Sequence, residues 1–356
     1  MSNKIGMNPS KNCLIDNLNK ILDMKKLLLC SFFLFVFFPE LFAQEPGADR
    51  MREHLKSEEF NVGFLLQSLA NFSFTDDEFN GGNKFDIGAT RLSFHGRVDN
   101  GFIYKMQMDF RRNVSILDAQ VGYAFSDDFR IITGAFKPFL SIDLDPNPGA
   151  TDFINRARQV GAMMNSREIG ITALGESDNL NYRIGMYNGN GLARSNDGGF
   201  LYTARLGYLI SSDNSEFKIG LNGAFNQTEM ERVGNTGLIS TGDRVLYGFF
   251  VQYDSESLFG DFEFLQTQFD TPEPDIEETI TGFFATLGTH LSERTDLLAR
   301  WDHLEFDEFG QSSELLIFGL NHQATQLISF QANLLTLIPE TGDTQVGLSG
   351  NFQFQF

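Results

Sequence analysis

The feature that most constrains the fold is a strict alternation in the stretch "FIYKMQMDFRR", residues 102–112. The apolar residues of one face are Phe102, Tyr104, Met106, Met108 and Phe110. The residues of the other face, polar apart from Ile103, are Lys105, Gln107, Asp109 and Arg111. Because successive side chains of a strand point to opposite faces, this period of two predicts a strand with one apolar face.

The same alternation recurs along the chain. It returns in "TRLSFHGRV" (90–98), "ILDAQVGYAF" (116–125), "FLYTARLGYLI" (200–210), "EFKIGLNGAF" (216–225), "RVLYGFFVQY" (244–253) and "QVGLSGNFQFQF" (345–356). With weaker cases we count about 16 units between residues 60 and 356, a spacing that suits membrane strands of ~9–11 residues joined by turns. No long segment after residue 59 has the period of a core helix or the solid apolar composition of a doubly buried strand.

The connections between these units also alternate in length. Short polar turns are predicted near residues 99–101, 126, 176, 211, 255, 292 and 324. Longer loops are predicted at residues 75–84, 140–167, 191–198, 228–242, 271–278, 307–313 and 339–344. Short turns at one rim and long loops at the other are typical of an outer-membrane barrel.

The sequence therefore predicts an all-β fold, a transmembrane antiparallel β-barrel of about 16 strands with a long third extracellular loop. Phe102, Met106 and their neighbours would face lipid, while Lys105 and Gln107 would face a wet lumen. A secreted β-sandwich or adhesin is the alternative fold, since the same apolar faces could pack on each other.

The N-terminal residues read as targeting sequence. A basic start at Lys25 and Lys26, an apolar run at 27–38 and the small residue Ala43 predict a secretory signal peptide at 24–43. We expect residues 1–23 to be a non-native N-terminal extension, 44–59 a periplasmic N-terminal segment and 60–356 the outer-membrane β-barrel. Cys30 could mark a lipoprotein, but no apolar region precedes it.

Composition narrows the function classes. Both cysteines precede residue 44, so the expected mature chain has no thiol chemistry, and the net charge of −20 argues against a nucleic-acid partner. The five histidines are scattered, and neither Gly-x-Ser-x-Gly nor His-Glu-x-x-His occurs. We expect no enzyme, no catalytic residue, no metal and no cofactor; an outer-membrane barrel hydrolase remains the competing class.

Particular stretches resemble the phosphate-selective porin family of types O and P. They are "GAFKPF" (134–139), "FINRARQVGAMMNSREIGI" (153–171) and "YRIGMYNGNG" (182–191), and the C-terminal "FQF" ending at Phe356 is similar to the signal read by the barrel assembly machinery. The resemblance covers roughly residues 60–356. It implies a 16-stranded porin, usually a homotrimer, whose third loop folds inward and whose basic side chains guide small anions such as phosphate or pyrophosphate.

The alternation on the strands and the long loop predicted at residues 140–167 together indicate which basic residues could line the pore and bind anions. On the strands these are Arg91, Lys105, Arg183, Arg205 and Lys218, and in or beside the long loop they are Arg156, Arg158 and Arg167. Rows of arginine can bind planar oxyanions through two hydrogen bonds. Two alternatives stay open: the bases could pair with lumen acids such as Asp109, Asp118, Asp261 and Asp302 and stiffen the wall, or the chain could be a general or cation-preferring porin.

Overall fold

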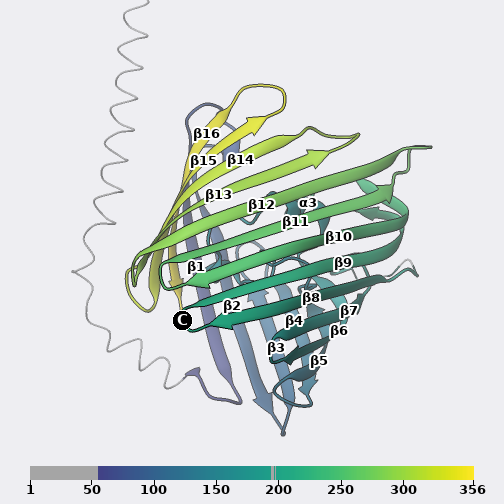
Figure 1. The fold of residues 1–356 in the computed structure, drawn as a ribbon, viewed down its shortest axis with the longest axis vertical. Coiled ribbons are helices and arrows are strands. Elements are labelled where there is room, and N and C mark those ends of the chain that lie inside the picture. The colour runs from purple at the N-terminus through teal and green to yellow at the C-terminus, as the bar shows by residue number, and fades with distance from the viewer. Residues whose placement is uncertain (1–54, 194–195, 197) are drawn as a thin grey trace, which may run out of the picture. The chain divides into compact units, whose positions relative to one another are not determined.

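The computed structural model describes residues 55–193, 196 and 198–356, which form a closed barrel of antiparallel strands (Figure 1). Each strand pairs with the next along the chain, and β16 pairs with β1. The predicted 16-stranded all-β barrel is confirmed. The strands are β1 (Asn61–Ser73), β2 (Lys84–Val98), β3 (Phe102–Asp109), β4 (Ser115–Ala124), β5 (Phe129–Phe136), β6 (Glu168–Ser177), β7 (Leu180–Tyr187), β8 (Leu201–Ser212), β9 (Ser215–Arg232), β10 (Ile239–Ser255), β11 (Leu258–Asp270), β12 (Glu277–Ser292), β13 (Thr295–Phe306), β14 (Ser313–Gln323), β15 (Ile328–Pro339) and β16 (Gln345–Gln355).

The two faces of the wall follow the predicted alternation. On β3, Phe102 is 54% exposed on the outside, whereas Gln107 is 6% exposed and points inward. One bulge interrupts the pattern on β4: Gln107 pairs with Asp118 and Met108 pairs with Ile116, which leaves Leu117 as the extra residue. Ile116 therefore shares the outer face with Met108, an irregularity that simple alternation cannot show.

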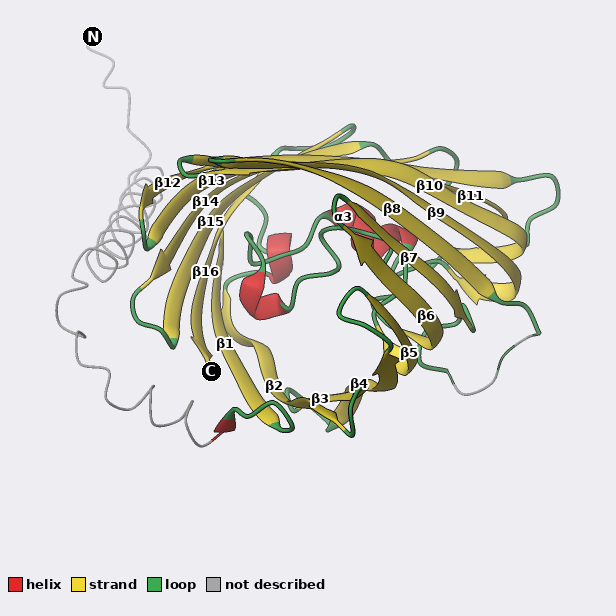
Figure 2. Ribbon diagram, turned by 60° about the horizontal axis from the view of Figure 1, so that its bottom comes forward, coloured by secondary structure: helices red, strands yellow, loops and turns green. Residues whose placement is uncertain are grey.

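The connection between β5 and β6, residues 137–167, is called loop L3 here. It holds the 3-10 helix η3 (Pro148–Ala150) and the helix α3 (Arg158–Met163), and Figure 2 shows α3 inside the ring of strands. A third short helix, η2 (Phe79–Gly81), lies in the loop between β1 and β2. The inward-folded loop that the family resemblance implied is thus present.

One predicted loop is much shorter in the structure. Residues 228–242 were expected to form a connection, but β9 and β10 extend through most of them and leave only residues 233–238. Val233 is fully buried against α3, and the amide of Asn235 donates to the carbonyl of Gly161. Gly234 has φ +51°, and a Cβ there would lie 2.3 Å from that carbonyl oxygen, so this contact requires glycine.

The extension and signal peptide predicted at residues 1–43, and most of the periplasmic segment predicted at 44–59, lie outside the described residues. Residues 55–60 are described, and they run beside the end of β2, where the amide of Arg97 donates to the carbonyl of Glu58. Within the described part of the chain, no helix has the length and apolar character needed to cross a bilayer.

Candidate functional site

Polar side chains of the wall hold the middle of L3, residues 148–154. Amides on β1, β14, β15 and β16 donate to four successive parts of the loop backbone: Gln67 to the carbonyl of Pro148, Gln353 to Gly149, Gln331 to Thr151 and Asn321 to Asp152. In return, the amide of Ile154 donates to Asn333. These side-chain amides satisfy backbone carbonyls of the loop, which has no neighbouring strand to bond them inside the lumen.

The parts of L3 before and after this middle stretch rest on an apolar inner wall. Leu140, Ile142, Val160 and Met163 pack against inward side chains of β10 to β13, including Leu246, Phe250, Leu265 and Phe284. Buried Glu263 on β11 lies within this patch, and it accepts hydrogen bonds from the Ser141 hydroxyl and the Ile142 amide at 2.5 and 2.9 Å. The apolar patch and the buried carboxylate together fix the loop to one side of the barrel.

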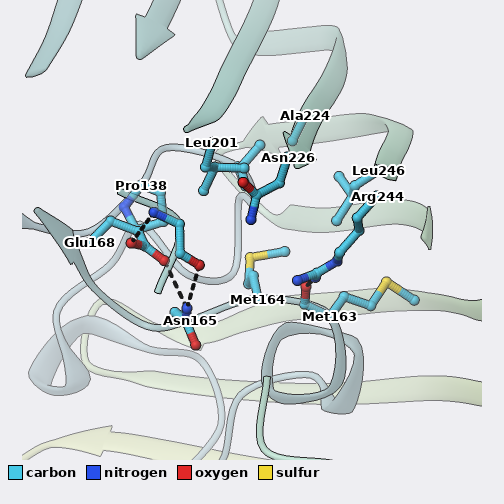
Figure 3. A pocket seen from close by; sticks show the side chains of 12 residues that line it. Pro138, Met163, Met164, Asn165, Glu168, Leu201, Ala224, Asn226, Arg244 and Leu246 are labelled. Atoms are coloured by element: carbon cyan, nitrogen blue, oxygen red, sulfur yellow. Dashed lines mark hydrogen bonds between the residues drawn. The ribbon is translucent and has the colours of Figure 1, made fainter. Parts of the chain in front are cut away.

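The loop is also fastened where it returns to β6. Glu168 accepts hydrogen bonds from Asn165 and from the amides of Gly189 and Gly191, and Arg244 donates to the carbonyl of Met163. Figure 3 shows Asn165, Glu168 and Arg244 around a cavity of about 20 Å³, room for about one water molecule. The cavity is too small for a solute, so this region has a structural role.

Asp152 in L3 makes the stability of the folded barrel depend on pH. Burial, and secondarily the charge of Asp261, raise the pKa of its carboxyl from 3.8 to about 6. Between these values the folded barrel keeps a proton that the unfolded chain releases, so the free energy of unfolding falls as the pH rises through this window.

Asp152→Asn removes this titration. Because the side chain is only partly buried, we expect the variant to be about 1–2 kcal/mol more stable than the unmutated barrel above pH 6, and equally stable near pH 4. Urea unfolding in lipid vesicles at pH 4 and pH 8, followed by the fluorescence of Trp301, measures the difference. Asp343→Asn on an exposed loop is the control, and an unchanged pH slope in Asp152→Asn would contradict the assignment.

Opposite the apolar inner wall, four bases surround two acids on β2, β3, β4 and the end of L3. Asp118 accepts from Lys105 at 2.8 Å and from Arg167 at 2.7 Å. Asp109 accepts from Arg111 at 2.9 Å and lies 3.8 Å from Arg91. We call these six residues the basic cluster.

The acids of the basic cluster are hidden behind its bases. The side chains of Asp109 and Asp118 are 5% and 2% exposed, whereas those of Arg111 and Lys105 are 44% and 29% exposed. Four cations also exceed two carboxylates, so the cluster is net positive. An ion in the lumen would meet ammonium and guanidinium groups here, not carboxylates.

A cavity of about 590 Å³ lies below the basic cluster, toward the short turns. It is lined by Lys105 and Gln107 of the cluster region, by His95, Arg97 and Arg130 on β2 and β5, and by Asn147 of L3. Glu58 is its one acidic lining residue among the described part of the chain. The basic surface therefore continues from Arg111, near the long-loop rim, to Arg97 and Arg130, near the opposite rim.

The other predicted candidates lie apart from the basic cluster. Arg183 on β7 and Arg205 on β8 both contact Asp145 of L3, and Lys218 on β9 has no ion-pair partner among the described residues. In L3, Arg158 forms an ion pair with Asp302 at 2.9 Å and donates to Ser313.

Arg156 donates to the carbonyl of Pro146 at 2.5 Å. Since Arg156 and Arg158 hold L3 together and to the wall, they anchor the loop, and a direct role for them in anion binding stays a prediction.

Pairing of bases with lumen acids is therefore part of the structure. Asp109, Asp118 and Asp302 take part in it, while Asp261 instead accepts a hydrogen bond from Gln252. The pairing stiffens the wall, but at the basic cluster it leaves the cations on the side of the lumen.

Sequence reasoning missed two basic residues, Arg130 and Lys137. Arg130 alternates with the outward residues of "FRIITGAF", and that pattern would have placed it in the lumen. The Nζ of Lys137 donates to the carbonyls of Leu144, Asp145 and Pro146 at 2.9, 3.1 and 2.7 Å. Burial, followed by the charge of Arg156, lowers the pKa of Lys137 to about 7. No sequence pattern marks such a contact.

The first half of the barrel matches a known family. Residues 60–210 match the family model described as phosphate-selective porin O and P. Over these residues, the family resemblance predicted from the sequence is confirmed. No curated protein matches the chain.

Solved porins share the fold of this porin. The anion-selective porin from Comamonas acidovorans superimposes with a TM-score of 0.64 at 12% identity, covering 84% of this chain and 99% of the other. OmpT of Vibrio cholerae, in its trimer form, gives 0.61 at 10% identity, covering 83% and 99%. Salmonella typhi OmpF, solved in complex with daunomycin, gives 0.62 at 10% identity, covering 83% and 97%.

The family match and the fold together support a channel in the outer membrane. The outward apolar face of the strands, with Phe102 and its neighbours, is accordingly the face toward lipid. At identities near 10%, the likeness to the solved structures shows the fold alone.

Proposed function

We propose that this porin allows small anions to diffuse passively through its lumen, with phosphate or pyrophosphate as the leading candidates. The main support for the proposal is the arrangement of the basic cluster. Lys105 and Arg111 face water, and the two acids of the cluster, Asp109 and Asp118, are buried behind them. A permeating ion responds most to the charges nearest its path, because salt screens more distant charges over ~8 Å.

Two further observations support the proposal. The cavity next to the cluster carries Arg97 and Arg130 beside a single acid, Glu58, among its described lining residues. One of the solved porins of the same fold is described as anion-selective. Guanidinium groups bind planar or tetrahedral oxyanions through paired hydrogen bonds, which favours phosphate over a spherical ion such as chloride.

A general or cation-preferring porin is the second candidate function. The net charge of −20 favours it, since many acids lie in exposed loops, as Glu273 and Asp275 do. These loop acids border bulk solvent, where screening weakens them, whereas the basic cluster lies on the wall of the lumen. We therefore rank anion passage first.

We also propose a homotrimer and recognition of Phe356 by the barrel assembly machinery. Strands β3, β5 and β7 have only eight residues each, and their outer face exposes Phe102, Met106 and Ile184. A short apolar wall of this kind suits contact with neighbouring copies. Phe356 closes the barrel, since its backbone N–H and C=O both bond to Phe64 of β1.

Addition of phosphate tests the proposed solute. In a planar bilayer that contains the purified porin in potassium chloride, we expect millimolar phosphate to reduce the chloride current, because an ion held by several bases leaves slowly and blocks the path. The control is the same bilayer in potassium chloride of equal ionic strength without phosphate. An unchanged current would show that the lumen does not bind phosphate.

A further inference from the structure

Residues 144–146 of L3, called the loop tip here, place one carboxylate between two arginines of the wall. Asp145 Oδ2 accepts from Arg183 Nη1 at 2.5 Å and from Arg205 Nη1 at 2.7 Å. The two arginines come from neighbouring strands and are directly paired in the sheet. Both guanidinium groups lie over aromatic rings, that of Arg183 over Phe139 at 4.7 Å and that of Arg205 over Phe250 at 4.9 Å. The rings hold the two cations in place.

The arrangement has more cationic than anionic groups. Lys218 is a third base beside the arginines: a Cβ at Gly207, two residues from Arg205, would lie 3.1 Å from Cε of Lys218. Asp145 is the one carboxylate that pairs with these bases among the described residues. The pairing also leaves polar atoms unused, since Asp145 Oδ1 and Arg205 Nε are buried without a hydrogen-bond partner.

Lys137 fixes the position of Asp145. From the root of L3 its ammonium group donates to the carbonyls of Leu144, Asp145 and Pro146, so three successive peptide groups bend around one cation. Since the carbonyl of Asp145 is held from one side, its carboxylate is directed to the arginines on the other. Among the described residues, the hydrogen bonds that join the loop tip to β7 and β8 are made by the Asp145 carboxylate.

We propose that Arg183, Arg205 and Lys218 form an oxyanion site whose occupant in this structure is the porin's own Asp145, and that a permeating oxyanion displaces this carboxylate. A monoanionic carboxylate leaves the three bases undercompensated, whereas a phosphate dianion brings two charges and more acceptor oxygens. Displacement would release the loop tip from β7 and β8. This inference rests on the proposed passage of anions.

Asp145→Asn tests the proposal, because the neutral amide competes poorly for two guanidinium groups. We expect inorganic phosphate to inhibit the chloride current at a concentration about tenfold lower than in the unmutated porin, equivalent to the loss of one competing charged hydrogen bond. Asp213→Asn, which removes an equal charge from the exposed β8–β9 turn, is the matched control and should leave the phosphate dependence unchanged. Adding Arg205→Gln to Asp145→Asn should abolish the gain.

The outcomes separate this inference from the proposed function. If phosphate has no effect on the unmutated porin and its current is carried by potassium, the proposed function fails. If the unmutated porin is inhibited by phosphate and Asp145→Asn has the same inhibition constant, only the tethered carboxylate is refuted. Should Asp145→Asn not assemble, Lys137→Met loosens the same loop tip, and it should also lower the inhibitory phosphate concentration; no change in Lys137→Met would overturn the proposal.

Discussion

Met106→Arg is expected to destabilise the barrel by ~2–4 kcal/mol, the cost of a charged side chain on the lipid face near the bilayer midplane. Met106 lies in the middle of β3, is 36% exposed on the outer face and pairs across the sheet with Phe94 and Ala119. No acid lies on this face of β3 to compensate the new charge. Urea unfolding of the porin in lipid vesicles gives the free energy directly.

The control for Met106→Arg is Gln120→Arg. Gln120 pairs with Lys105 on the neighbouring strand at nearly the same depth, but it lines the water-filled cavity. The new cation is then hydrated, and we expect a cost below about 1 kcal/mol, as for a surface substitution. Equal losses of stability at the two positions would show that the lipid and lumen faces of β3 and β4 are assigned incorrectly.

Reversal of two lumen charges is expected to have the largest effect on ion passage. In the double variant Lys105→Glu and Arg130→Glu, both sites line the cavity, and the change moves the local charge by four units. Each charge contributes on the order of 1 kcal/mol to an ion about 4 Å away in water, so the chloride-to-potassium permeability ratio should fall by at least tenfold. The ratio is obtained from the reversal potential in a salt gradient.

A charge-matched variant separates this local effect from that of net charge. Arg112→Glu with Arg232→Glu makes the same change of four units at exposed positions outside the cavity. We expect its permeability ratio to stay within about twofold of the unmutated value, because the Debye length of ~8 Å screens these sites. A similar fall in both double variants would mean that net charge, not the cavity wall, sets the preference.

The wall of the barrel could be predicted from sequence because its signal is local. Each strand repeats a period of two, so the outward positions of Phe102, Tyr202 and Leu221 follow from the residues beside them. The end of β9 was harder to predict, since residues 228–232 are polar apart from Met230 and Gly242 looks like a loop residue. Strand pairing beyond the lipid layer overrides that local preference.

The path of L3 through the lumen was hard to predict from the sequence. Its attachments join residues far apart in the chain, such as Ser141 with Glu263 and Arg158 with Asp302. One signal was present: on β10 both faces carry large apolar residues, with Leu246 and Phe250 pointing inward. An apolar strip on the lumen face must be covered by something, and L3 covers it.

In the candidate site too, local alternation was predictable and long-range contacts were not. Alternation predicts that Arg91, Lys105 and Arg205 point inward, and in the structure they do so. It cannot predict which of these bases remain open to solvent, because that depends on the acids that meet them from L3 and from other strands. Arg205 is covered by Asp145, whereas Lys105 lies in front of Asp118.

The reversal potential of the unmutated porin in a potassium chloride gradient tests the central claim most directly. If the basic cluster controls the lumen, the potential has the sign of chloride preference, and it moves toward zero as the salt concentration rises and screens the cluster. A potential with the sign of potassium preference at low salt would contradict the account, because the acidic loops would then outweigh Lys105, Arg111 and the bases that line the cavity.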